Sequence, residues 1–167
     1  MSIIWGLKYL CLTIKHKWYV GLAGLKVGVP VWRLIVHDWT KFLPCELPAY
    51  GRQFFGDKGD PYGFAKAWAH HQNYNPHHWE YWIPRTAHNK SGYPDNVPLP
   101  MPETYVREMV ADWMGASKAY TGSWDMNEWL DKNLLKMVLH GDTITVLRDV
   151  LISLNEDYHR HTWQLTA

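Results

Sequence analysis

The sequence predicts an all-α fold, and three observations support that prediction. Apolar residues recur at helical spacing along most of the chain, and no segment alternates convincingly as a half-buried strand does. Proline and glycine stand where helices would begin and end. The 167 residues suffice for one domain, and a hydrophobic content of 47% supplies its core. We therefore expect a compact helical bundle that forms a single domain over residues 1–167.

The first half of the chain predicts three main helices. The first covers about residues 3–26, and its apolar residues at helical spacing are Leu7, Leu10, Ile14, Tyr19 and Leu22. Pro30 is well placed to open a second helix that carries residues 31–39. Residues 51–63 are rich in glycine and aspartate and are expected to form a loop. A third helix then covers about residues 61–73.

The second half follows a break at Asn75-Pro76, because the residue before a proline avoids the helical conformation. A short helix is expected from Pro76 to Trp82. Residues 84–102 contain five prolines and predict a long irregular loop. Further helices are expected over about residues 103–120, from Ser123 or Asp125 to His140, and from Asp142 or Thr143 to about His159, with Gly141 ending the second of them.

The composition excludes several classes of protein. A formal net charge of +1 argues against a broad basic surface for extended duplex nucleic acid. Two cysteines are too few for a disulfide scaffold, so free thiols in the cytoplasm are expected. The apolar run at the start is interrupted by Lys8 and falls short of the roughly 20 residues that a membrane span needs. We therefore expect a buried first helix and no membrane partner.

Four histidine and aspartate residues stand inside apolar helical segments. They are His16, the adjacent pair His37-Asp38, and Asp112. A buried carboxylate is costly unless it is paired or bound to a metal. A lone core histidine is more often structural, but four such groups together indicate a metal site. Glu108 lies four residues before Asp112, where it could support that site or belong to a solvated face.

A second histidine cluster lies around the Asn75-Pro76 break. His70-His71 precede the break, and His77-His78 follow it, with Glu80 next along the chain. Chain reversal could bring either pair toward the same point, or one pair could be exposed or stacked on tryptophans. Imidazoles and carboxylates suit Mn, Fe, Co, Ni or Zn. The sequence therefore predicts one or two divalent transition-metal ions.

The order His16, His37-Asp38, Asp112 resembles the signature of the HD superfamily of metal-dependent phosphohydrolases. Residues 34–41 are similar to that family's helix, in which an apolar run leads to His-Asp and a lysine follows three residues later. The additional histidines resemble members that hold two metals, and residues 67–82 resemble an uncharacterised bacterial and phage branch. A phage-encoded chain would work in the host cytoplasm. The Asp-Gly-Tyr-Pro run of the cyclic-dinucleotide phosphodiesterases does not follow the double histidine, so that substrate is not carried over.

The resemblance implies an HD-type bundle with the metal at its centre and a metal-bound water as nucleophile on phosphorus. It implies that the first ion is held by His16, His37, Asp38 and Asp112. His71 and His78 are the expected ligands of a second ion, with His70 and His77 nearly as suitable. If His70 and His77 are not ligands, they are expected to have catalytic roles.

The resemblance also implies residues that act on a small phosphorylated substrate, such as a nucleotide. Lys41 could neutralise phosphate charge or pair with Asp38, or it could be a solvated helix end. Glu80 could orient an imidazole or act as a base. Arg85 and Lys90 could grip phosphate, although plain solvation of the loop is the simpler interpretation.

Three functions are compatible with these patterns. The first is hydrolysis of a phosphoester or phosphoanhydride by metal-activated water. The second is oxygen activation, because some HD-type proteins that bind two irons through this ligand set are oxygenases. The third is a non-catalytic helical interaction protein, in which the histidines are structural and the tryptophans form a partner-binding face.

Overall fold

The computed structural model describes residues 3–84, 92–94 and 96–162, and every regular element within them is helical. With η for a 3-10 helix, the elements are α1 (Ile3–Val27), α2 (Val31–Val36), η1 (Trp39–Phe42), α3 (Leu47–Phe55), α4 (Pro61–Tyr74), η2 (Trp79–Trp82), α5 (Glu103–Thr121), α6 (Asn127–Asn133), η3 (Leu134–Lys136), α7 (Gly141–Leu154), η4 (Glu156–Tyr158) and α8 (His159–Thr162). The predicted all-α class is confirmed for this part of the chain.

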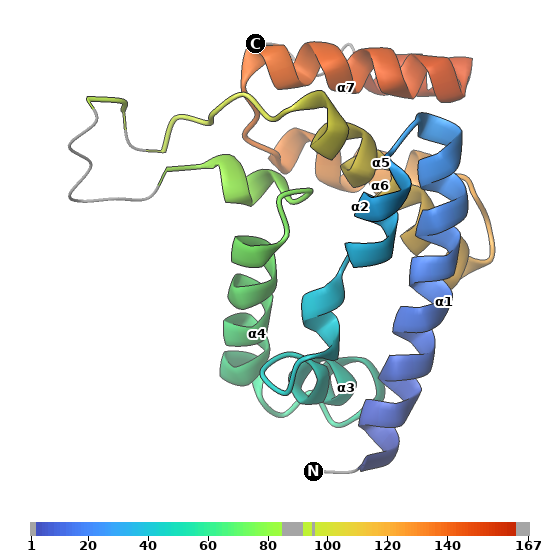
Figure 1. Ribbon diagram of the computed structural model, residues 1–167, viewed down its shortest axis with the longest axis vertical. Helices are drawn as coiled ribbons and strands as arrows, with labels where there is room; N and C mark the ends of the chain where they lie inside the picture. Colours follow the sequence, from blue (N-terminus) through green and yellow to red (C-terminus); the bar gives the residue numbers. More distant parts are fainter. Residues whose placement is uncertain (1–2, 85–91, 95, 163–167) are drawn as a thin grey trace.

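Helix α1 runs along one side of the molecule and connects two groups of helices (Figure 1). It packs on α3 and on α5, α3 packs on α4, and α5 packs on α7. The main core lies among α1, α5, α6 and α7, whereas a smaller core of Tyr9, Tyr50 and Ala67 joins α1, α3 and α4. His16 falls between Tyr9 of the smaller core and Val20 of the main core, so α1 carries it to the junction of the two groups.

Helices α1 and α5 approach each other very closely at Gly115. A Cβ atom at position 115 would stand 2.5 Å from Val20 Cγ2 and 2.7 Å from the Val20 backbone nitrogen. Real side chains do not tolerate such distances, so only glycine fits here without moving α1. Gly115 thereby sets the distance between the helices that carry His16 and Asp112.

Local signals place α4 and α5 as predicted. The Asp60 carboxylate accepts a hydrogen bond from the Gly63 backbone N–H at 2.8 Å, and Pro61 follows at the first helical position. Helix α4 ends at Tyr74, directly before the Asn75-Pro76 break. Helix α5 ends at Gly122, whose φ of 82° suits a residue without a side chain.

Two predicted boundaries in the first half are wrong. The second helix ends at Val36 instead of residue 39, because His37 (φ −50°, ψ 131°) leaves the helical conformation and Asp38 is left-handed. The expected loop over residues 51–63 is partly helical, since α3 continues to Phe55. Tyr50 and Gly51 are buried, and Gly51 lies against the α1 backbone, so tertiary packing favours a helix despite the glycines.

Two boundaries in the second half are also wrong. The helix expected to reach His140 gives way to η3, which ends at Lys136, and Gly141 begins α7 instead of ending its predecessor. His140 explains this start, because its Nδ1 atom accepts a hydrogen bond from the Asp142 backbone N–H at 3.1 Å. Helix α7 ends at Leu154 rather than near residue 159, and η4 and α8 follow as separate short elements.

Helix α1 is buried on one face only, so the expectation of a buried first helix is wrong in part. Its buried residues are Tyr9, Thr13, His16, Val20, Ala23, Gly24 and Val27. Leu7, Ile14 and Leu22 of the predicted stripe are exposed. Apolar residues occupy both faces, so periodicity alone did not identify the covered one. Among the described helices, none has the length and apolar character needed to cross a membrane.

Candidate metal centre

The His37-Asp38 pair lies in the break between α2 and η1. Asp38 has φ 56° and ψ 23°, a left-handed conformation that aspartate tolerates better than most residues. Lys17 of α1 donates a hydrogen bond to the His37 carbonyl and so holds the break against α1. The His37 and Asp38 residues are only 1% and 0% exposed, so the break directs both side chains inward.

A first group of potential ligands comes from α1, the break and α5: His16, His37, Asp38 and Asp112. His16 Nε2 lies 2.9 Å from Asp112 Oδ1 and 3.3 Å from Asp38 Oδ2. His37 Nε2 lies 3.3 Å from Asp112 Oδ1 and 3.5 Å from Asp38 Oδ2. The ligand atoms of this group all lie within 4.8 Å of one another, so they could hold a metal ion.

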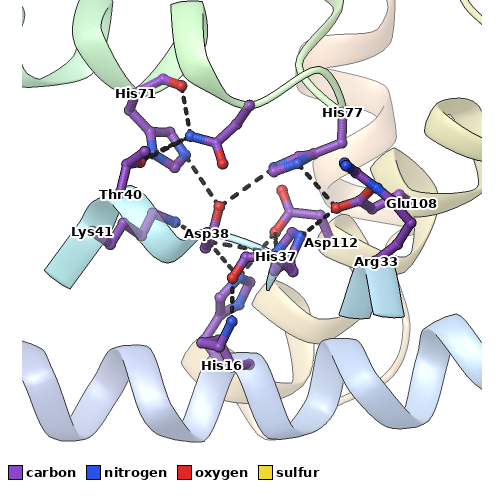
Figure 2. Close-up of polar contacts among 12 residues, drawn as sticks. His16, Arg33, His37, Asp38, Thr40, Lys41, His71, His77, Glu108 and Asp112 are labelled. Carbon is purple, nitrogen blue, oxygen red and sulfur yellow. Dashed lines mark hydrogen bonds and ion pairs between the residues drawn. The ribbon is translucent and has the colours of Figure 1, made fainter. Parts of the chain in front are cut away.

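A second group shares Asp38 and adds three histidines from α4 and the turn after it: His71, His77 and His78. His71 Nε2 lies 3.2 Å and His77 Nε2 lies 3.4 Å from Asp38 Oδ1. Figure 2 shows Asp38 between the two groups, with contacts to histidines on both sides. One oxygen of a single carboxylate therefore faces each group.

The unpartnered imidazole nitrogens of the centre indicate that it can bind a cation. Five buried or nearly buried histidines have an Nε2 atom without a hydrogen-bond partner among the described residues: His16, His37, His71, His77 and His78. A nitrogen lone pair that faces a carboxylate oxygen is repelled unless a proton or a metal ion lies between them. The donor set of imidazoles and carboxylates suits a divalent transition metal.

The model of a family of unknown function, DUF5662, matches residues 6–153, a range that includes every ligand candidate above. The chain belongs to the DUF5662 family. No curated protein and no solved structure matches it. The metal centre of this DUF5662 member is therefore defined by its own residues.

In this DUF5662 member, two buried glutamates contact the imidazoles at Nδ1, the ring nitrogen on the side away from the potential metal positions. Glu46 Oε2 lies 3.1 Å from His71 Nδ1. Glu108 Oε1 lies 3.0 Å from His37 Nδ1 and 3.4 Å from His77 Nδ1. A carboxylate on Nδ1 fixes the ring and leaves Nε2 directed at the metal position.

The charges of the centre compensate one another. Burial opposes ionisation of Glu108, but the hydrogen bond from His37 and the close contact of His77 outweigh it and lower the pKa of the carboxyl to about 2. Burial likewise opposes ionisation of Asp38, but the charges of His37 and Lys41 hold its pKa well below the usual range. The centre is therefore anionic at its carboxylates over the ordinary pH range.

A pocket of about 460 Å³ opens onto the centre. Its polar lining includes His16, Lys41, His77, His78, Glu80 and Asp112, and its aromatic lining includes Tyr9, Tyr50, Phe54, Trp68, Trp79, Trp113, Tyr120 and Trp129. Lys41 Nζ donates a hydrogen bond to Asp38 Oδ2 at 2.5 Å, so the lysine both pairs with the shared carboxylate and borders the pocket. The pocket therefore borders four of the potential ligands: His16, His77, His78 and Asp112.

The structure brings most of the predicted site residues together at the centre and its pocket. The two groups contain all six predicted metal ligands and also His77, which had been assigned a catalytic role. Lys41 and Glu80 border the pocket. His70 lies outside both groups, with its Nδ1 2.6 Å from Glu46 Oε1 and its ring stacked on Tyr74. Arg85 and Lys90 lie outside the described residues.

Several supporting residues were missed in the sequence. Glu46, Thr40 and Asn75 surround the Nδ1 side of His71, and Arg33 pairs with Glu108. Glu108, by contrast, had been named as a possible support, because it lies one turn before Asp112. Glu46 offered none, since it lies in a proline-flanked segment without a helical pattern.

Adding Co²⁺ is expected to raise the melting temperature more at pH 8 than at pH 6. Burial opposes a charge on His16 and His37, but their carboxylate partners outweigh it and raise both pKa values above the usual range. Without metal, the stability linked to these protons is present at low pH and is lost as the pH rises through the raised pKa values. The same rise frees the nitrogens for an ion. Thermal unfolding with and without Co²⁺ would check this, and an equal increment at both pH values would contradict it.

Proposed function

We propose that this chain is a metal-dependent phosphohydrolase of the HD type that acts on a small phosphorylated substrate such as a nucleotide. The observation that carries the proposal is the sharing of Asp38. Its Oδ2 atom faces His16 and His37, and its Oδ1 atom faces His71 and His77. A carboxylate shared between two sets of imidazoles is the arrangement expected of a two-metal hydrolytic centre.

The residues divide into two ligand sets. His16, His37, Asp38 and Asp112 would hold one ion, and Asp38 with His71, His77 and His78 would hold the other. When bound, such ions lower the pKa of a water molecule and neutralise charge on a phosphoryl oxygen.

The pocket supports a substrate of the size of a nucleotide. Its volume of about 460 Å³ is in the range of small-molecule sites. Lys41 and Lys136 supply cationic groups for phosphate, and the aromatic wall offers flat surfaces for a base. Lys41 is positioned by Asp38 and would keep a phosphoryl group oriented toward the ligand sets.

The proposal is tested with purified protein loaded separately with Mn, Fe, Co, Ni or Zn. The substrates are p-nitrophenyl phosphate, bis-p-nitrophenyl phosphate, and nucleoside mono-, di- and triphosphates. We expect hydrolysis of one phosphoester or phosphoanhydride class with at least one metal, loss of activity in EDTA, and recovery on adding the metal back. Asp149→Asn, on the exposed face of α7, serves as the matched control and should leave the rate unchanged.

Two results would overturn the proposal. One is a protein that binds two irons and consumes oxygen without releasing phosphate or nucleoside products, which would favour the oxygenase function. The other is a protein that binds none of the five metals at any pH, which would favour a structural role for the histidines.

A further inference from the structure

We propose that Glu108 is the positioning residue that couples the two ligand sets, so that altering its carboxylate weakens metal binding at both. The inference rests on the two-ion centre of the proposed function but not on the reaction catalysed. It assigns a role to a residue whose side chain touches neither Asp38 nor Asp112 in any described contact.

The contacts of Glu108 join one imidazole from each set. Its Oε1 atom lies 3.0 Å from His37 Nδ1 and 3.4 Å from His77 Nδ1, and the two ring centroids are 4.4 Å apart. The Nε2 atom of His37 faces the first set, and that of His77 faces the second. Figure 2 shows Glu108 behind these two rings, on the side away from Asp38. One oxygen atom therefore supports both sets.

Arg33 decides which oxygen of Glu108 faces the histidines. Its Nε and Nη2 atoms both donate to Glu108 Oε2, at 2.9 and 2.7 Å. The guanidinium also lies over the Tyr105 ring, with its carbon 4.6 Å from the ring centroid. Oε2 is thus occupied, and Oε1 remains for the imidazoles. Glu108 is 0% exposed, so solvent does not substitute for either contact.

An ionised carboxylate oxygen can only accept hydrogen bonds. Oε1 accepts a hydrogen bond from His37 Nδ1 and lies in electrostatic contact with His77 Nδ1, so it favours the tautomer of each ring that carries its proton on Nδ1. That tautomer leaves the lone pair on Nε2, which is the atom that faces the metal position in each set. The shared oxygen thereby prepares one nitrogen of each set for ligation.

Glu46 provides a natural comparison. Like Glu108 it is 0% exposed and supports an imidazole through Nδ1, but within the centre it contacts only His71 of the second set. Its other contact is His70, which lies outside both sets. A change at Glu46 should therefore affect one set, whereas a change at Glu108 should affect both.

The test is a Co²⁺ titration of metal-free wild type, Glu108→Gln and Glu46→Gln, followed by calorimetry and by the visible absorption of bound Co²⁺. In Glu108→Gln, Arg33 can donate only to the amide oxygen, so the amide NH₂ faces His37 and His77. That group cannot accept, and the imidazole protons are driven to Nε2, where they block ligation. We expect two Co²⁺ ions in wild type, a loss of about 10–100-fold in affinity at both sites in Glu108→Gln, and a comparable loss at one site in Glu46→Gln.

The double variant Arg33→Met/Glu108→Gln separates positioning from simple structural damage. Without Arg33 the amide can turn its oxygen toward the imidazoles, so part of the affinity should return at both sites. A purely structural role predicts further loss instead. The double variant also decides the matter if Glu108→Gln alone does not fold.

The outcomes separate the two proposals. Loss at a single site in Glu108→Gln, or no recovery in the double variant, would overturn the coupling role and leave the two-ion centre intact. A wild-type protein that binds no Co²⁺ would overturn the centre and the coupling role together.

Discussion

The Asp38→Asn variant is expected to lose Co²⁺ at both sites and, with it, the phosphohydrolase activity that we propose. An amide has one acceptor atom and one donor group, so it cannot present an anionic oxygen to both ligand sets, as Asp38 does. The loss of affinity should exceed the roughly 100-fold that removal of an outer partner costs. Asparagine tolerates the left-handed backbone, so the result reports on the carboxylate and not on the fold of the break.

The same change should also destabilise the protein through Lys41. Its ammonium group donates to Asp38 Oδ2 and is largely buried, so Asp38→Asn leaves it without its carboxylate partner. Breaking a buried pair in this way costs about 3–5 kcal/mol. The double variant Asp38→Asn/Lys41→Met should regain most of that stability in urea unfolding while binding no more Co²⁺ than the single variant. Two Co²⁺ ions in Asp38→Asn would contradict the shared-carboxylate arrangement.

Gly115→Ala is expected to lower both stability and metal affinity at the first ligand set. The new Cβ would meet the Val20 backbone nitrogen at 2.7 Å and its Cα at 2.9 Å, so α1 must move away from α5. Overpacking of this kind typically costs about 1–3 kcal/mol. The movement would separate His16 from Asp112, which lie 2.9 Å apart and stand one turn before Val20 and Gly115 on their helices.

Gly21→Ala is the matched control for that change. Gly21 also lies inside a helix, but a Cβ there meets no atom within 4 Å. Alanine should therefore stabilise α1 by about 0.5–1 kcal/mol and leave Co²⁺ binding unchanged. Denaturant unfolding and Co²⁺ titration of both variants decide the comparison. If Gly115→Ala binds both ions with wild-type affinity, the helix spacing does not control the first set.

The ligand candidates could be predicted because each has a strong local signal. His16, the His37-Asp38 pair and Asp112 are polar residues inside apolar segments, and such residues need a partner when buried. The double histidines were also identified, but their orientation was not. His71 faces the centre and His70 faces Glu46 because they lie 100° apart on α4, and the sequence alone does not say which side of α4 is covered.

Glu108 could be named as a possible support because it lies one turn before Asp112, but Arg33 and Glu46 depend on contacts between distant segments and could not be predicted. Arg33 and Glu108 are 75 positions apart, and Glu46 reaches His71 across 25 positions. The end of α2 was predicted wrongly for a related reason. Periodicity continued through residue 39, but the hydrogen bond from Lys17 and the left-handed Asp38 ended α2 early.

The backbone at Asp38 restricts which residues evolution can place there. A left-handed conformation admits glycine, asparagine and aspartate readily and costs most other residues about 1–2 kcal/mol. The centre requires a side chain with two anionic oxygens, a condition that only aspartate and glutamate meet. Aspartate is the only residue type that meets both the backbone condition and the chemical condition. Glutamate, the usual conservative exchange for aspartate, is disfavoured by the left-handed backbone. Asparagine is disfavoured because its amide lacks two anionic oxygens. We therefore expect every substitution at position 38 to impair the centre or the fold.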